Sequence, residues 1–152
     1  RTAGGGGGSE FSDREIPQGA RITELRIHAG RYIDGIQVVY ALRDGSTLEG
    51  PLRGRRGGSP NVLKLEANEY ITGISGRYGD YVDSLRVHTN RRTSRLYGGT
   101  PGKEYRFEVP AGNMAIGFFG REGRYMDAIG LNYVSTRQMQ NQDRRWFRRQ
   151  RQ

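Results

Sequence analysis

Apolar and polar residues alternate along most of this chain in short runs, a pattern typical of half-buried β-strands. Turn signals such as Asp44-Gly45 and Pro110-Ala111-Gly112-Asn113 separate the runs at the spacing of all-β proteins. No segment within 1–134 has a clear helical period, so we expect an all-β body. The expected strands are 22–27, 36–42, 62–65, 69–75, 85–90, 105–109, 116–120 and 131–134.

One phrase occurs three times: Gly-x-Tyr-x-Asp, followed by a small residue and then an aliphatic one. Its aspartates, Asp34, Asp83 and Asp127, are separated by 49 and 44 residues, which indicates a structural unit that is used several times. In an extended segment the Tyr and Asp side chains point to one side and the residue between them points to the other. We therefore expect the intervening residues in the core, with the rings and carboxylates on one surface. The intervening residues are Ile33, Val82 and Met126.

The repeated phrase has the chemistry of a sugar-binding site. A carboxylate accepts two hydrogen bonds side by side, which is the arrangement that vicinal hydroxyls of a sugar offer as donors. A neighbouring aromatic edge suits the apolar face of a pyranose, and the glycine allows a ligand to approach bare backbone. A structural turn with a solvated aspartate is the alternative for a single copy. Three copies that each keep the tyrosine favour binding.

The glycine content points to loops around these motifs. Glycine makes up 24 of the 152 residues, well above the usual share of about 7%. Three Gly-rich segments, 1–12, 51–61 and 97–102, match the three motifs in number and suggest three pairs around a pseudo-threefold axis. The five consecutive glycines in the first segment fit either a flexible linker or a loop with bare backbone amides.

The net charge of +9 would fit a nucleic-acid partner, but much of it lies at the C-terminus. Residues 135–152 contain six arginines against one aspartate, and we expect them to form a basic, flexible tail or a short helix that folds on a partner. The Trp146-Phe147 pair between arginines could stack on bases or meet an anionic membrane. These activities remain alternatives to a function of the body.

The motifs resemble those of the jacalin-related lectins, the β-prism I family. The similarity covers residues 3–134 and is most specific in 117–130, which contains Gly123-Arg124-Tyr125-Met126-Asp127. Three tyrosine-containing copies are similar to griffithsin, a member with three mannose sites on one prism. The resemblance implies three four-stranded antiparallel sheets with pseudo-threefold symmetry. It also implies a lectin domain over 1–134, followed by the tail 135–152.

The resemblance further implies that each sugar site combines one aspartate motif with one Gly-rich loop. The second and third loops contain fewer glycines than the first, so we rank the Asp127 site above the other two. The first expected site contains Gly123, Arg124, Tyr125 and Asp127 with Gly7 and Gly8. The second contains Gly30, Tyr32 and Asp34 with Gly57 and Gly58, and the third contains Gly79, Tyr81 and Asp83 with Gly98 and Gly99.

The expected function is therefore non-covalent, metal-free binding of mannose- or glucose-containing glycans, including high-mannose glycoproteins. Galactose-preferring members use a free amino group created by cleavage before the glycines, whereas here Arg1-Thr2-Ala3 precede them in one chain. We expect no cofactor. A homo-oligomer or a further partner domain fits the tail, and both secreted and cytoplasmic locations fit the sequence.

Other functions have weaker support. A glycosidase needs two carboxylates flanking one bond, and threefold placement would put the three aspartates in separate sites. The chain has no cysteine, and His28 and His88 fall in expected strands, where packing is the simpler role. We therefore expect no enzymatic activity. A β-prism that serves only as a protein-interaction scaffold remains an alternative.

Overall fold

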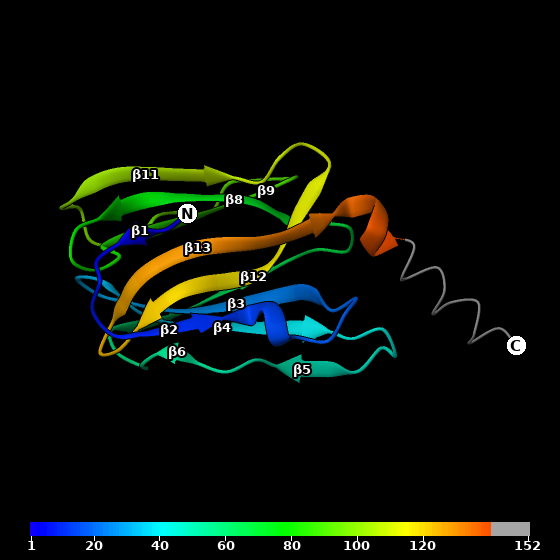
Figure 1. The fold of residues 1–152 in the computed structure, drawn as a ribbon, viewed down its shortest axis with the longest axis horizontal. Helices are drawn as coiled ribbons and strands as arrows, with labels where there is room; N and C mark the ends of the chain where they lie inside the picture. Colours follow the sequence, from blue (N-terminus) through cyan, green and yellow to red (C-terminus); the bar gives the residue numbers. More distant parts are fainter. Residues whose placement is uncertain (141–152) are drawn as a thin grey trace, which may run out of the picture.

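Three antiparallel sheets contain all the named strands of residues 1–140, the part of the chain that this computed structural model describes (Figure 1). The first sheet has the order β1 (Ala3–Gly4), β13 (Met126–Ser135), β12 (Asn113–Glu122) and β2 (Ser9–Ser12). The second has the order β10 (Tyr97–Gly98), β9 (Ser84–Thr89), β8 (Ile71–Tyr78) and β11 (Lys103–Glu108). The all-β expectation is confirmed.

The third sheet follows the same plan with a divided edge strand. Its order is β5 (Thr47–Glu49), β4 (Ile33–Ala41), β3 (Arg21–Ala29) and β7 (Ser59–Lys64), and β6 (Arg53–Gly54) also pairs with β4. Gly50 lies between β5 and β6, and its N–H still donates to the Val38 carbonyl at 2.8 Å. The edge is thus one interrupted strand, as expected next to Pro51, which has no N–H to donate.

The pairing register relates three Gly-rich loops to one another. We call residues 4–9 the first loop, 54–59 the second and 98–103 the third. Each begins at a glycine paired with the residue after a motif aspartate: Gly4 with Ala128, Gly54 with Gly35, and Gly98 with Ser84. Each ends five residues later, at Ser9, Ser59 or Lys103, paired with the residue before a motif glycine. The loops are therefore equivalent position by position.

The motifs themselves join the three sheets at one end of the prism, which we call the motif end. Ile33, Val82 and Met126 are fully buried, as the alternation predicted. The Ile33 N–H donates to the Val82 carbonyl at 2.9 Å, and the Val82 N–H donates to the Met126 carbonyl at 2.8 Å. Backbone hydrogen bonds thus connect the three motifs directly.

A buried aspartate connects the first and third sheets. Asp13 lies in a short 3₁₀ helix, η1 (Asp13–Glu15), and is 4% exposed. Its Oδ2 accepts the Phe118 N–H at 2.9 Å, and its Oδ1 accepts from the Arg53 guanidinium at 2.9 Å. That guanidinium also lies 4.9 Å from the centre of the Phe11 ring. The N-terminal segment is therefore anchored by its own contacts rather than free as a linker.

The strand predictions were correct for the long central strands and missed the short ones. Strands β1, β2, β5, β6 and β10 have between two and four residues and carry little alternation. At the C-terminus, Ser135 still pairs with Asn113, residues 136–140 are helical, and Met139 is 2% exposed (Figure 1). Residues 141–152 of the expected tail lie outside the described residues. Within 1–140, no helix is long and apolar enough to cross a membrane.

A buried ion pair holds two turns at the end opposite the motifs. The Glu69 side chain is fully buried, accepts from Arg92 Nε at 2.8 Å and from Thr89 Oγ1 at 2.6 Å, and caps the Glu66 N–H at 2.8 Å. Burial alone would raise the pKa of Glu69. The hydrogen bonds from Arg92, Thr89 and the Glu66 backbone outweigh burial and lower the pKa from 4.5 to about 2.

This pair predicts an acid-sensitive component of stability. Above pH 4.5 the Glu69 carboxylate is charged in both states and its contribution is complete. As the pH falls from about 4.5 to about 2 the unfolded chain takes up the proton first, so the contribution is lost. We expect Glu69→Gln to lower the free energy of unfolding by about 2–3 kcal/mol near neutral pH and to flatten this part of the pH profile.

Urea unfolding across this pH range measures both effects. Glu108→Gln is the matched control, because Glu108 pairs with Arg106 on the surface and its side chain is 62% exposed. Wild-type and Glu69→Gln profiles that run parallel down to the acid limit would contradict the assigned role of Glu69.

Candidate functional site

The motif end gathers three nearly buried carboxylates, Asp34, Asp83 and Asp127, which are 5%, 6% and 5% exposed. Each follows a fully buried core residue, so strand alternation turns it toward the surface. The motif glycine stands over each carboxylate: a methyl group added to Gly30, Gly79 or Gly123 would lie 3.7, 3.6 or 3.3 Å from an aspartate oxygen. A side chain at any of these glycines would therefore lie against a carboxylate oxygen.

The three motif tyrosines meet one another at the centre of the motif end. The ring centres of Tyr32, Tyr81 and Tyr125 are 4.8–5.0 Å apart, with tilted or edge-on geometry. The sequence predicted rings and carboxylates on one surface, but it did not predict that the rings pack together. Because all three sites border one cluster, they lie close together and face the same end of the prism.

The Asp127 site consists of Asp127, Gly123, Gly7 and Gly8. Methyl groups added to Gly7 and Gly8 would lie 2.7 Å from Asp127 Oδ2 and Oδ1, so any side chain there would fill the space over the carboxylate. Arg121 holds the loop in place, because its Nε donates to the Gly7 carbonyl at 2.8 Å and its Nη2 donates to the Gly8 carbonyl at 2.9 Å.

The Asp127 carboxylate is ready to accept further hydrogen bonds. Its Oδ1 is buried and has no hydrogen-bond partner among the described residues. Burial raises the pKa of Asp127, while the charge of Arg121 and a hydrogen bond from the Asp127 backbone N–H oppose that rise. A buried acceptor without a partner is costly, so a ligand that donates hydroxyl groups would relieve this cost.

The Asp34 site consists of Asp34, Gly30, Gly57 and Gly58, and it contains an arginine. A methyl group added to Gly57 would lie 2.3 Å from Asp34 Oδ2, so Gly57 matches Gly7. Arg55 Nη2 lies 3.6 Å from the same oxygen, and the Arg55 guanidinium carbon lies 5.1 Å from the Tyr125 ring centre. Position two of the other loops is Gly5 or Gly99, so this arginine is specific to the second loop.

At the Asp83 site, the glycine that faces the carboxylate is not one of the two that the sequence predicted. Gly98 and Gly99 match Gly4 and Gly5: methyl groups added to them would strike the backbone carbonyls of Asp83 and Arg31, at 2.4 and 2.5 Å. Gly102, which the prediction missed, faces the carboxylate, with an added methyl group 2.6 Å from Asp83 Oδ2. Gly102 is the fifth residue of its loop, as Gly8 and Gly58 are of theirs, so aligning the three loops by position identifies it.

Pro101 takes the place that Gly7 and Gly57 have in the other two loops. A proline brings a ring to the position that faces the carboxylate, and it has no N–H to donate. The next residue, Gly102, has a φ of +103°, and the equivalent Gly8 and Gly58 have φ values of +70° and +62°. Only glycine adopts this left-handed backbone freely, which explains why all three repeats retain glycine at this loop position.

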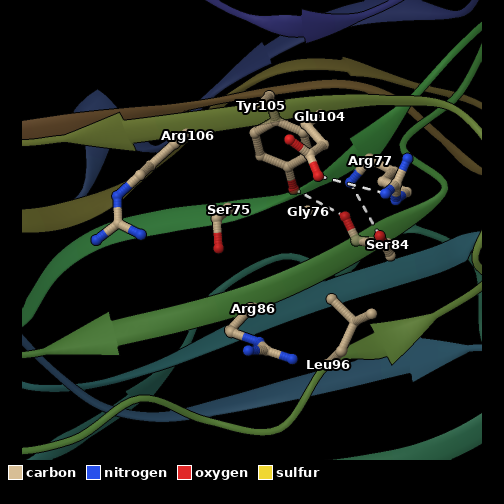
Figure 2. A pocket seen from close by; sticks show the side chains of 9 residues that line it. All are labelled: Ser75, Gly76, Arg77, Ser84, Arg86, Leu96, Glu104, Tyr105 and Arg106. Atoms are coloured by element: carbon tan, nitrogen blue, oxygen red, sulfur yellow. Dashed lines mark hydrogen bonds and ion pairs between the residues drawn. The ribbon is translucent and has the colours of Figure 1, made fainter.

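The third loop, like the first, is held by an arginine that donates to a loop carbonyl. Arg77 Nη1 donates to the Gly102 carbonyl at 2.9 Å, and Arg77 Nη2 lies 3.3 Å from Glu104 Oε1. Figure 2 shows Arg77 between Glu104 and Ser84, at the edge of an open cavity of about 460 Å³ on the β8–β9–β11 sheet. The motif aspartates do not line this cavity. Its lining residues are Ser75, Gly76, Arg77, Ser84, Arg86, Leu96, Glu104, Tyr105 and Arg106.

Metal ligands are not clustered in the described part of the chain. No group of three or more His, Cys, Asp or Glu side chains within 1–140 could hold a metal ion. His28 and His88 lie in β3 and β9, and His88 Nε2 is 2.7 Å from Ser75 Oγ. Burial lowers the pKa of both histidines.

Solved structures of lectins have the same fold. Wild-type Malaysian banana lectin is 34% identical and superposes with a TM-score of 0.78, covering 90% of this chain and 96% of that one. AcmJRL, a mannose-binding jacalin-related lectin from Ananas comosus, is 28% identical with a TM-score of 0.78, covering 89% and 95%. The prism architecture is therefore that of these lectins.

Sequence relatives agree with the structural ones. Horcolin from Hordeum vulgare is 35% identical over 135 residues, which are 84% of this chain and 90% of that protein. A protein of Schizosaccharomyces pombe named as a zinc metalloproteinase is 36% identical over 127 residues, but these cover only 20% of its length. Residues 1–132 match the Jacalin-like lectin domain, and with these relatives the chain belongs to the jacalin-related lectin family.

Proposed function

We propose that this domain binds mannose- or glucose-containing glycans through the Asp127 site and the Asp34 site, without a metal ion. The observation that carries the proposal is the Asp127 carboxylate. It is 5% exposed, one of its oxygens has no partner among the described residues, and glycines stand over it from two segments. Vicinal sugar hydroxyls can supply the missing donors.

The chain around the Asp127 site is continuous, unlike that of the galactose-preferring members, which use an amino group created by cleavage before the glycines. Ala3 and Gly4 pair with Ile129 and Ala128 and continue without a break into the first loop. In this sequence the glycines that face Asp127 are thus internal residues, preceded by Arg1, Thr2 and Ala3. This supports the mannose or glucose expectation over galactose, and a mannose-binding relative such as AcmJRL supports it independently.

The arrangement of sites suits branched glycans. One shallow site with a few hydrogen bonds corresponds to a dissociation constant of about 1 mM, or about −4 kcal/mol. The sites surround a single tyrosine cluster at one end of the prism. Simultaneous engagement of two sites by one glycan can raise apparent affinity by about 10²–10⁴-fold where the spacing allows it. High-mannose glycoproteins are therefore the partners that we propose.

Asp127→Asn tests the role of the principal carboxylate. The substitution keeps the shape but replaces a charged acceptor by a neutral amide, so we expect about 10–100-fold weaker binding of methyl α-mannoside at this site. NMR titration monitored at the Gly8 amide measures that affinity, and the Gly58 amide reports the Asp34 site in the same experiment. Asp44→Asn is the matched control, because Asp44 lies in an exposed turn where its side chain accepts hydrogen bonds from Ser46. Unchanged affinity at Gly8 would refute the proposal.

Pro101→Gly tests whether Pro101 weakens sugar binding at the Asp83 site. The substitution restores both an N–H donor and the space that Gly7 and Gly57 leave over their carboxylates. We expect mannoside affinity at the Asp83 site, measured at the Gly102 amide, to rise about tenfold. Pro110→Gly, in the turn after β11, is the control for the general effect of losing a proline. If Pro101→Gly leaves the Gly102 titration unchanged, proline is not what weakens this site.

A further inference from the structure

The three sites share a backbone plan but differ in charge. Positions two and three of the loops are Gly5-Gly6 in the first, Arg55-Arg56 in the second and Gly99-Thr100 in the third. Both arginines of the second loop are exposed. The first loop has no cation and the third has one, Lys103, at its end, so the Asp34 site carries the most cations on its own loop.

The motifs add further charges, because each loop touches the motif of a neighbouring site. The residue between the motif glycine and tyrosine is Arg31, Asp80 or Arg124, and all three are exposed. A methyl group added to Gly5 would lie 2.4 Å from the Asp80 carbonyl, and one added to Gly99 would lie 2.5 Å from the Arg31 carbonyl. The first loop thus borders Asp80 and the third borders Arg31.

The second loop correspondingly borders the motif that contains Arg124. The position of Arg55 over the Tyr125 ring, at 5.1 Å, places the loop beside that motif. The Asp34 site therefore has Arg55 and Arg56 on its loop and Arg31 in its own motif, and Arg124 belongs to the neighbouring motif that Arg55 contacts. At the Asp127 site the Arg124 charge is offset by Asp80, and Arg121 is paired with Glu10. At the Asp83 site Asp80 is offset by Arg31, Arg77 is paired with Glu104, and Lys103 adds a single cation.

We propose that the Asp34 site selects anionic glycans, in which a mannose- or glucose-type residue carries a phosphate, sulfate or carboxylate on its outward side. This inference rests on the proposed function, because Asp34 would still hold the sugar hydroxyls. Asp34 is a single carboxylate, and Arg55 at 3.6 Å is the arginine that it can neutralise. The remaining guanidinium groups are available for a planar, bidentate contact with an oxyanion.

Exposure limits the size of this preference and makes it dependent on salt. The Arg55 side chain is 47% exposed, and contacts between exposed charges contribute little each and are screened by salt. Two or three such contacts correspond to about fivefold tighter binding at low ionic strength. The preference should disappear at about 1 M salt, where the screening length is about 3 Å.

The test compares α-mannose 1-phosphate with methyl α-mannoside on the full chain by NMR titration at low and high salt. The two probes share every ring hydroxyl and differ only at the anomeric substituent. We expect the phosphate to bind about fivefold tighter at the Gly58 amide, with no preference at the Gly8 amide. Arg56→Gln should remove most of the preference at Gly58. Arg91→Gln, which removes an exposed arginine from the turn after β9, should leave it intact.

Each outcome has a defined meaning. Equal affinities of the two probes at Gly58 would overturn this inference and leave the proposed function standing. A preference that survives Arg56→Gln, or that inorganic phosphate alone reproduces in an Asp34→Asn variant, would also overturn it, because phosphate would then bind independently of the sugar site. Failure of both probes to bind at Gly8 and Gly58 would instead refute the proposed function.

Discussion

The architecture depends on the contact that the three Gly-x-Tyr-x-Asp motifs make with one another. Ile33, Val82 and Met126 fill the core, and backbone hydrogen bonds run from the first to the second of these residues and from the second to the third. Because side chains alternate along a strand, burying these residues turns the flanking Tyr and Asp outward at the same end. One packing constraint thus positions three aromatic rings and three carboxylates together.

The glycine loops follow from that placement. The motif aspartates are turned outward but remain about 5% exposed, because a loop of identical pairing lies over each of them. A loop so close to a carboxylate tolerates no side chain at the positions of Gly7 and Gly57. At Asp127 one carboxylate oxygen has no hydrogen-bond partner among the described residues, which favours a ligand that donates hydrogen bonds. Differences among the sites then come from side chains at the few loop positions that vary, chiefly Arg55, Arg56 and Pro101.

The repeat and its alternation were sufficient to predict an all-β body and the burial of the aliphatic residue within each motif, whereas the three-sheet architecture was expected from the family resemblance. The tyrosine cluster was not predicted, because rings on separate strands meet only after the prism closes. Assigning Gly98 and Gly99 to the Asp83 carboxylate relied on adjacent glycines, whereas the register shows that Gly102 faces it. The short edge strands and the Asp13–Arg53 pair escaped prediction for a similar reason, since both depend on contacts between segments far apart in the sequence.

A crystal structure of the full chain with methyl α-mannoside would test the central claim most directly. The account predicts a sugar at the motif end, with two hydroxyl groups donating to the Asp127 carboxylate and the backbone of Gly7 and Gly8 beside the ring. It also predicts a second sugar over Asp34 and no metal ion between sugar and protein at either site. A sugar bound instead on the open face of a sheet, or motif carboxylates without sugar at saturating concentration, would contradict the account.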